Sequence, residues 1–169
     1  MNETMRAAAA RVRPALFIGS QFKGAEIADA SVPLYRQTHS QQYSLSTVGN
    51  DCKWGATHGS ETGINLTACA AAKRYADAVG QQFRGHNLCW GNNNPAWLLR
   101  KGREDPGGLR SILQRHITGV MQGLVKQTGS PPLAWDVVNE ACADKPAANG
   151  SFFKHVEPWS ALPDYVDGE

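Results

Sequence analysis

The chain has 169 residues, of which 41% are hydrophobic and 19% charged, with a formal net charge of +2, as expected for one globular domain with a single core. So small and scattered a positive charge gives no basic face for a phosphate backbone, so no nucleic-acid partner is expected. No run approaches the roughly 20 apolar residues that span a bilayer, so no membrane segment is predicted. Residues 1–19 also lack the apolar stretch of a signal peptide, and any secretion signal of the parent protein would lie outside this chain.

Strands and helices alternate in the predicted structure, after a short helix-prone leader at residues 1–15. The predicted strands are short apolar runs at residues 16–20, 43–48, 83–90 and 133–138. The predicted helices cover residues 31–42, 67–82 and 109–126. The second of them has a polar side formed by Lys73, Arg74 and Asp77. Such alternation indicates βαβ units on a parallel sheet, so the predicted fold class is α/β.

Polar and aromatic side chains follow the predicted strands. In a parallel α/β protein the carboxyl ends of the strands converge on one mouth, where functional groups gather. Carboxylate, amide and indole groups together suit a sugar, which has an apolar ring face and a rim of hydroxyls, and a carboxyl group suits cleavage of a glycosidic bond. These side chains are Asn50, Lys53 and Trp54 after the second strand, His86, Asn87, Trp90 and Trp97 at or after the third, and Asn139 and Glu140 after the fourth.

Taken one by one, these residues also have purely structural interpretations. His86 fits a hydrogen-bonded core histidine, Lys53 a surface cation and Glu140 a solvated carboxylate. Trp90 and Trp97 fit core packing and sugar contact equally well, because aromatic burial serves both. Trp135 lies within a predicted buried strand and is interpreted as a core residue.

The four cysteines, Cys52, Cys69, Cys89 and Cys142, are too far apart for the close ligand pairs of a zinc knuckle. No metal site and no cofactor are therefore predicted. Buried thiols and one or two disulfides both remain open.

Three segments resemble glycoside hydrolase family 10. Residues 133–141 read LAWDVVNEA and match the WDVVNEA signature of that family, and residues 84–90, RGHNLCW, followed by Pro95-Ala-Trp97, resemble its RGHxLxW and PxW segment. Residues 47–54, TVGNDCKW, resemble the segment after the second strand. Residues 164–166 resemble the start of the following helix. The resemblance runs from about residue 17 to the last residues.

The resemblance implies that residues 16–169 form about the first half of a TIM (β/α)8 barrel, an incomplete catalytic domain of an endo-β-1,4-xylanase. It implies retaining hydrolysis of xylan, or of a related β-1,4-linked polysaccharide, without a cofactor. Glu140 would be the general acid/base, and Asn139 would bind the sugar 2-hydroxyl. Asn50, Lys53, His86 and Trp90 would line the glycone subsites. It also implies an extracellular or secretory location.

The sequence departs from the family pattern at three positions. Gly49 replaces the glutamate that precedes the asparagine of the second-strand motif, and Gly91 replaces a frequent histidine, so two glycone-side contacts are lost. Asn93 replaces a longer glutamine. These losses also fit a second function, a non-catalytic carbohydrate-binding or interaction protein derived from the same fold.

Length is the larger departure, because a full barrel needs roughly 250 residues. The catalytic nucleophile of the family, a glutamate on the seventh strand, has no counterpart here, and Glu169 cannot serve as one. The chain ends inside the next expected helix, which favours a truncated sequence. We therefore expect no xylan hydrolysis by this chain alone, and association through its exposed barrel edges.

Overall fold

The computed structural model describes residues 3–148, 150–151 and 153–162 of the chain. Its sheet has four strands in the order β1 (Gly19–Phe22), β2 (Leu45–Val48), β3 (Gln82–Trp90) and β4 (Ala134–Asn139). Each strand pairs in parallel with the next strand along the chain. The parallel α/β fold, with βα units in the order of the first half of a TIM barrel, is therefore confirmed.

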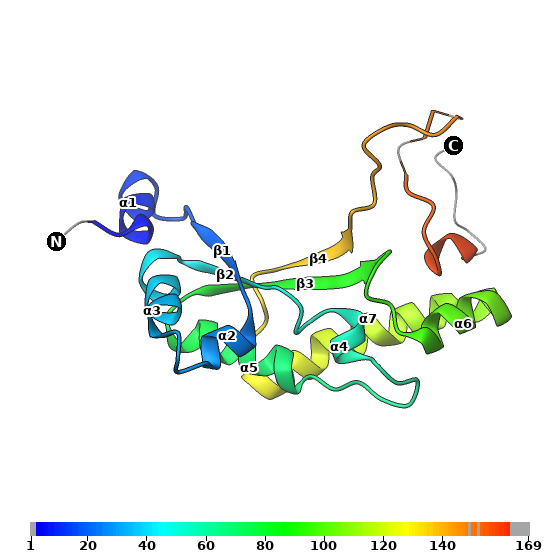
Figure 1. The fold of residues 1–169 in the computed structure, drawn as a ribbon, viewed down its shortest axis with the longest axis horizontal. Helices are drawn as coiled ribbons and strands as arrows, with labels where there is room; N and C mark the ends of the chain where they lie inside the picture. Colours follow the sequence, from blue (N-terminus) through cyan, green and yellow to red (C-terminus); the bar gives the residue numbers. More distant parts are fainter. Residues whose placement is uncertain (1–2, 149, 152, 163–169) are drawn as a thin grey trace.

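Helices connect the strands, and Figure 1 shows α5 and α7 running along one side of the sheet. No helix among the described residues is long and apolar enough to cross a membrane. The α-helices are α1 (Met5–Val12), α2 (Gly24–Ala28), α3 (Pro33–Gln42), α4 (Trp54–Thr57), α5 (Thr67–Ala78), α6 (Ala96–Glu104) and α7 (Leu109–Thr128), and the short 3-10 helices are η1 (Pro106–Gly108) and η2 (Trp159–Ala161).

The first strand was predicted three residues too early. Residues 16–18 are apolar but exposed, whereas β1 runs over Gly19–Phe22 and buries only Phe22 among its four residues. The apolar run therefore covers the approach to the strand and only the first two residues of the strand, Gly19 and Ser20. The helix expected to begin at residues 164–166 lies outside the described residues.

The two faces of the sheet differ in burial, as the alternation of side chains along a strand requires. Phe22, Val48 and Phe83 point to the helices and form one core with residues of α5 and α7, such as Ala76 and Leu124. The opposite face carries Gln21, Thr47 and Arg84, which lie in register on three neighbouring strands. This second face would be the barrel interior, and it is polar near the carboxyl ends of the strands.

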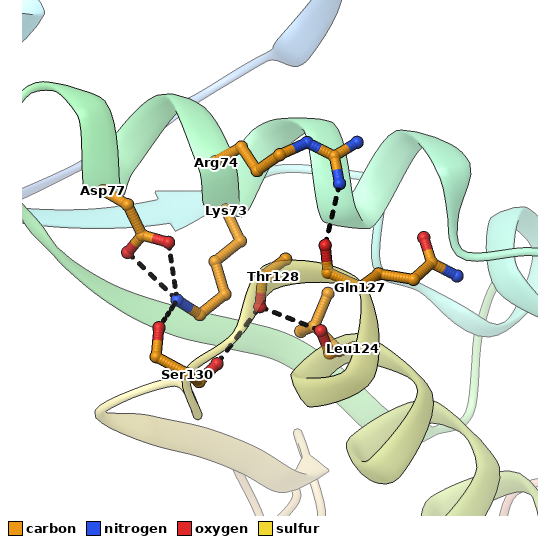
Figure 2. A network of polar contacts seen from close by, with 7 residues as sticks. All are labelled: Lys73, Arg74, Asp77, Leu124, Gln127, Thr128 and Ser130. Atoms are coloured by element: carbon orange, nitrogen blue, oxygen red, sulfur yellow. Dashed lines mark hydrogen bonds and ion pairs between the residues drawn. The ribbon is translucent and has the colours of Figure 1, made fainter.

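Lys73 was predicted on the polar side of its helix but is buried, with 1% of its surface exposed. Its ammonium group donates to both oxygens of Asp77, at 3.0 and 2.8 Å, and to Ser130 Oγ at 2.8 Å (Figure 2). Thr128 Oγ1 donates to the carbonyl groups of Leu124 and Ser130 in the same turn. The buried ammonium group therefore joins α5 to the turn between α7 and β4.

Removal of Asp77 is expected to cost more stability than removal of Lys73. Asp77→Ala leaves a buried cation without its counter-ion, which costs about 3 kcal/mol. Lys73→Met leaves Asp77, whose side chain is 41% exposed and can be solvated, so we expect a loss of about 1 kcal/mol or less. Urea unfolding followed by tryptophan fluorescence measures both changes. The reverse order of the two losses would contradict this account of the network.

One disulfide is present, between Cys52 and Cys69, and both residues are fully buried. It links the loop after β2 to α5 across 17 residues of sequence, a span for which loop-closure entropy predicts about 3 kcal/mol of stabilisation. Cys89 and Cys142 are free thiols, and burial raises the pKa of Cys89 to about 12. The sequence left both a disulfide and buried thiols open, and both occur: Cys52 and Cys69 form the disulfide, and Cys89 is a buried thiol.

The outer edges of β1 and β4 have no strand partner among the described residues. Within β4, Val137 is 53% exposed and Val138 is 59% exposed, and Leu133 just before the strand is also exposed. Unpaired backbone groups beside apolar side chains are a template for pairing with another chain. The structure thus carries the feature on which the expected association depends.

We expect the purified chain to form soluble oligomers through this edge. Replacing both Val137 and Val138 by lysine adds charge at the edge and should shift the chain towards the monomer in size-exclusion chromatography with light scattering. Leu34→Lys is the matched control, because Leu34 is a 70% exposed apolar residue on α3. A monodisperse wild-type monomer with a cooperative melt would contradict the prediction.

Candidate active site at the carboxyl ends of the strands

Four of the predicted site residues form a chain of contacts across the mouth of the sheet. Lys53 Nζ donates to Asn50 Oδ1 at 2.9 Å and lies 4.6 Å from the centroid of the Trp90 ring. Trp90 Nε1 donates to Glu140 Oε2 at 2.9 Å. The loop after β2, the end of β3 and the end of β4 therefore meet at one place, as the order of the strands predicts.

Glu140 follows directly on β4 and has a left-handed backbone with φ of 54°. A residue other than glycine adopts this conformation rarely and at an energetic cost, and such strain is concentrated at functional sites. Its side chain is 52% exposed, and Lys154 Nζ lies 3.9 Å from the same oxygen that Trp90 contacts. The carboxylate is thus held by an indole N–H and faces a cation while it stays accessible to a ligand.

His86 is fixed by Asp136, a contact that the sequence analysis did not identify. The distance between His86 Nδ1 and Asp136 Oδ2 is 2.8 Å, and Arg84 donates through Nε and a terminal nitrogen to the other carboxylate oxygen. Since a carboxylate only accepts, His86 Nδ1 carries the proton in this contact, and Nε2 remains for another partner. His86 and Asp136 are register partners on β3 and β4. Aligning the two predicted strands side by side could have identified this contact from the sequence.

Asn139 ends β4 and lies opposite Trp90 in the strand register. Its side-chain amide makes no hydrogen bond to a residue that the structure describes, so it remains available to a ligand. The structure therefore brings Asn50, Lys53, Trp90, Asn139 and Glu140 together with His86, whose ring centroid lies 6.4 Å from that of Trp90.

The other two tryptophans near this end belong to the core. Trp54 and Trp97 are almost fully buried, and Trp97 Nε1 donates to the carbonyl oxygen of His58 at 3.0 Å. Trp54 stacks on His116 with 3.6 Å between ring centroids. The sequence left both core packing and sugar contact open for Trp90 and Trp97. In the structure Trp90 lies at the mouth, whereas Trp97 packs in the core.

Other side chains lie close to Gly49 and Gly91. A Cβ atom at Gly49 would lie 2.5 Å from the amide nitrogen of Gln21. A Cβ atom at Gly91 would lie 3.0 Å from Cβ and Cγ1 of Val156, which comes from the segment after β4. Asn93 has a left-handed backbone with φ of 62°. Gln21 and Val156 could be identified only from the three-dimensional structure, because neither lies near these glycines in sequence.

The chemistry available at the mouth combines the exposed carboxylate of Glu140 with sugar-binding groups. Asp136 is already engaged by His86 and Arg84, so Glu140 is the carboxylate that could exchange a proton with a ligand. Among the described residues, no group of three or more histidine, cysteine, aspartate or glutamate side chains is placed to hold a metal ion. The arrangement can bind a polyhydroxylated ring and transfer a proton to or from it.

Comparisons with solved structures place the fold. The chain superposes on a glycosylated endo-β-1,4-xylanase of glycoside hydrolase family 10 from Gloeophyllum trabeum with a TM-score of 0.81 and 28% identity, covering 96% of this chain and 48% of that one. It superposes on a xylanase from Thermotoga petrophila, solved in complex with xylobiose, with a TM-score of 0.80 and 23% identity, covering 96% and 46% of the two chains. The second likeness shows the fold alone.

Comparisons of sequence give the same family. Endo-1,4-beta-xylanase B of Thermotoga neapolitana is 28% identical over 137 residues, which are 79% of this chain and 36% of that protein. An endo-1,4-beta-xylanase of Agaricus bisporus is 30% identical over 125 residues, which are 73% of this chain and 35% of that protein. The chain thus spans about a third of the length of these relatives. The family model described as glycosyl hydrolase family 10 matches residues 7–163. The chain belongs to glycosyl hydrolase family 10.

Proposed function

We propose that this chain supplies the acid/base half of the active site of an endo-β-1,4-xylanase. The observation that carries the proposal is the position of Glu140, which lies at the end of β4 in a strained conformation and accepts a hydrogen bond from Trp90. In the retaining mechanism one carboxyl group protonates the leaving oxygen and later activates water, while a second carboxylate attacks the anomeric carbon. Glu140 takes the first of these roles.

The neighbouring side chains bind the sugar in this proposal. Asn139 presents a free amide beside Glu140 and binds the 2-hydroxyl, while Asn50 and Lys53 form a hydrogen-bonding pair for the glycone side. Trp90 offers an indole face, and His86 an imidazole nitrogen held in place by Asp136. Xylan is the proposed substrate because xylanases of similar fold were solved in complex with xylobiose and, as a single-residue mutant, with xylotetraose.

Binding of xylotriose to the purified chain tests the proposal. Saturation-transfer NMR detects binding even to an oligomeric protein, and a titration gives the dissociation constant. Trp90→Ala should weaken binding by about five- to ten-fold through loss of the aromatic face. Phe17→Ala is the control, because Phe17 is an exposed aromatic residue before β1, at the opposite end of the strands. No binding by the folded wild-type chain would contradict the proposal.

A non-catalytic carbohydrate-binding protein is the second candidate. It is favoured by Gly49 and Gly91, because glycine lacks the hydrogen-bonding side chains that the family resemblance leads us to expect at these two positions. Both candidates predict xylotriose binding, so binding alone does not separate them. Hydrolysis does, once the second half of a barrel is supplied, because only the enzyme needs Glu140 as a proton donor.

We also propose an extracellular or secretory location for the protein. The Cys52–Cys69 disulfide supports it, because structural disulfides persist in oxidising compartments and are rare in the cytosol. Mass spectrometry of the protein from its native host, after alkylation of free thiols, tests this location. Alkylation of Cys52 and Cys69 in the native protein would contradict it.

A further inference from the structure

The side chain of Gln21 occupies the space that Gly49 leaves open. An ideal Cβ atom built on Gly49 would lie 2.5 Å from Gln21 Nε2 and 3.3 Å from the carbonyl oxygen of Phe22. The first distance is shorter than any real contact, so a side chain at position 49 and the amide of Gln21 in its present place exclude each other. The backbone of Gly49 stays on the strand path, since its N–H donates to Phe22 O at 2.8 Å.

Gln21 lies on the polar face of the sheet, opposite the face that packs against the helices. Its register partners are Thr47 on β2 and, through it, Arg84 on β3, whereas Phe22 points the other way into the core. The residue after Gly49 is Asn50, whose side chain binds Lys53. The amide of Gln21 therefore reaches from β1 towards the Asn50–Lys53 end of the site.

Gln21 is an exposed residue, and its amide group makes no hydrogen bond to any residue that the structure describes. A glutamine amide offers two donors and one acceptor, which match a sugar hydroxyl that both donates and accepts. Two amide side chains that make no hydrogen bond to a described residue thus flank the mouth, Gln21 beside β2 and Asn139 at the end of β4. The intervening Asn50 is instead engaged by Lys53.

We propose that Gln21 is a substrate-binding residue that hydrogen-bonds a hydroxyl group of a xylose unit beside Asn50, from the space left by the missing side chain at position 49. This proposal rests on the proposed function of the mouth as a xylan-binding site. It assigns a sugar contact to a residue of β1. The contact is made by a neutral amide, so it adds hydrogen bonding without adding a negative charge near Lys53.

Xylotriose affinity of a small set of variants tests the proposal. Gln21→Ala should weaken binding by about two- to ten-fold, the effect of one neutral hydrogen bond. Gly49→Ala should weaken it as well, because the new Cβ atom displaces the Gln21 amide. The double variant Gln21→Ala/Gly49→Glu places a polar side chain in the vacated space and should recover most of the lost affinity.

The control is Gln37→Ala, which removes an exposed glutamine on α3 and should leave affinity unchanged. Thermal melts verify that every variant folds, which is expected because Gln21 is exposed. If Asn50→Ala weakens binding while Gln21→Ala does not, the assignment of Gln21 is wrong and the proposed function stands. If the folded wild-type chain does not bind xylotriose at all, both proposals fail.

Discussion

The 169-residue chain on its own is expected to release no reducing sugar from xylan, although it carries the proposed acid/base residue. Retention of configuration requires two carboxyl groups roughly 5 to 5.5 Å apart on opposite sides of the scissile bond. At the mouth, Glu140 is accessible, but Asp136 is held by His86 and by Arg84 and cannot attack a sugar. The covalent intermediate needs a second carboxylate free to attack, and the structure shows Asp136 already engaged, so we expect no turnover.

A reducing-sugar assay with the purified chain at high concentration and long incubation measures this loss. The control is the same preparation in the xylotriose-binding experiment, which shows that the site is folded. Turnover that is abolished by Glu140→Ala would contradict the prediction and would imply a recruited second carboxylate. Glu157, which lies 3.6 Å from Arg103, and Asp144 are the candidates for that role.

Acidification is expected to destabilise the chain strongly because of a buried histidine pair. His58 at the end of α4 and His116 on α7 are almost fully buried, with 3.3 Å between their Nδ1 atoms. Burial, and to a lesser extent His58, lower the pKa of His116 from 6.5 to about 3. Burial, followed by the charge of Arg115, also lowers the pKa of His58. Both rings are therefore neutral in the folded chain.

The sign of the effect follows from proton binding. Below about pH 6.5 the unfolded chain binds a proton at His116 that the folded chain does not, so stability falls as the pH is lowered from about 6.5 towards 3. At pH 4.5 the loss from His116 alone amounts to roughly 2 to 3 kcal/mol. This stability is fully present above about pH 6.5.

His116→Phe separates this effect from the titration of the carboxylates, which is common to both proteins. The phenylalanine ring keeps a flat face against Trp54 but binds no proton, so the variant should lose less stability between pH 7 and pH 4.5 than the wild type. At pH 7 it should be about 1 kcal/mol less stable, because His58 loses its hydrogen-bond partner. Equal pH slopes of the urea midpoint in the two proteins would show that His116 is not the cause.

Much of the fold followed from local sequence pattern. The helical period between Leu109 and Lys126 predicted α7 within two residues, since a long amphipathic helix is specified by its own residues. Helix α6 was not predicted, and it begins directly after Pro95, which is its N-cap residue. The approach to β1 was mistaken for the strand, because an apolar run does not reveal which residues find a strand partner.

The site divides in a similar way. Glu140 and its neighbours were predicted because they belong to short motifs at strand ends, where topology alone brings them together. The contact of Asp136 with His86 depends on the register of β3 and β4. The position of the Gln21 amide beside Gly49 depends on the direction in which a side chain of β1 extends. The burial of Lys73 and the pairing of Cys52 with Cys69 also depend on tertiary structure, which residue spacing does not specify.

The most direct test of the central claim, that Glu140 is the acid/base residue of a xylanase site, is the rate of xylan hydrolysis by a completed barrel. Residues 7–163 are fused to the second half of a family 10 xylanase, with and without Glu140→Gln. The glutamine keeps an oxygen for Trp90 but is not a proton donor of the required kind.

We expect the fused protein to hydrolyse xylan and the Glu140→Gln variant to be slower by about 10²- to 10⁴-fold. Glu104→Gln, a change of the same kind at a 63% exposed position on α6, should retain the full rate. A folded and active fusion whose rate is unchanged by Glu140→Gln would contradict the account.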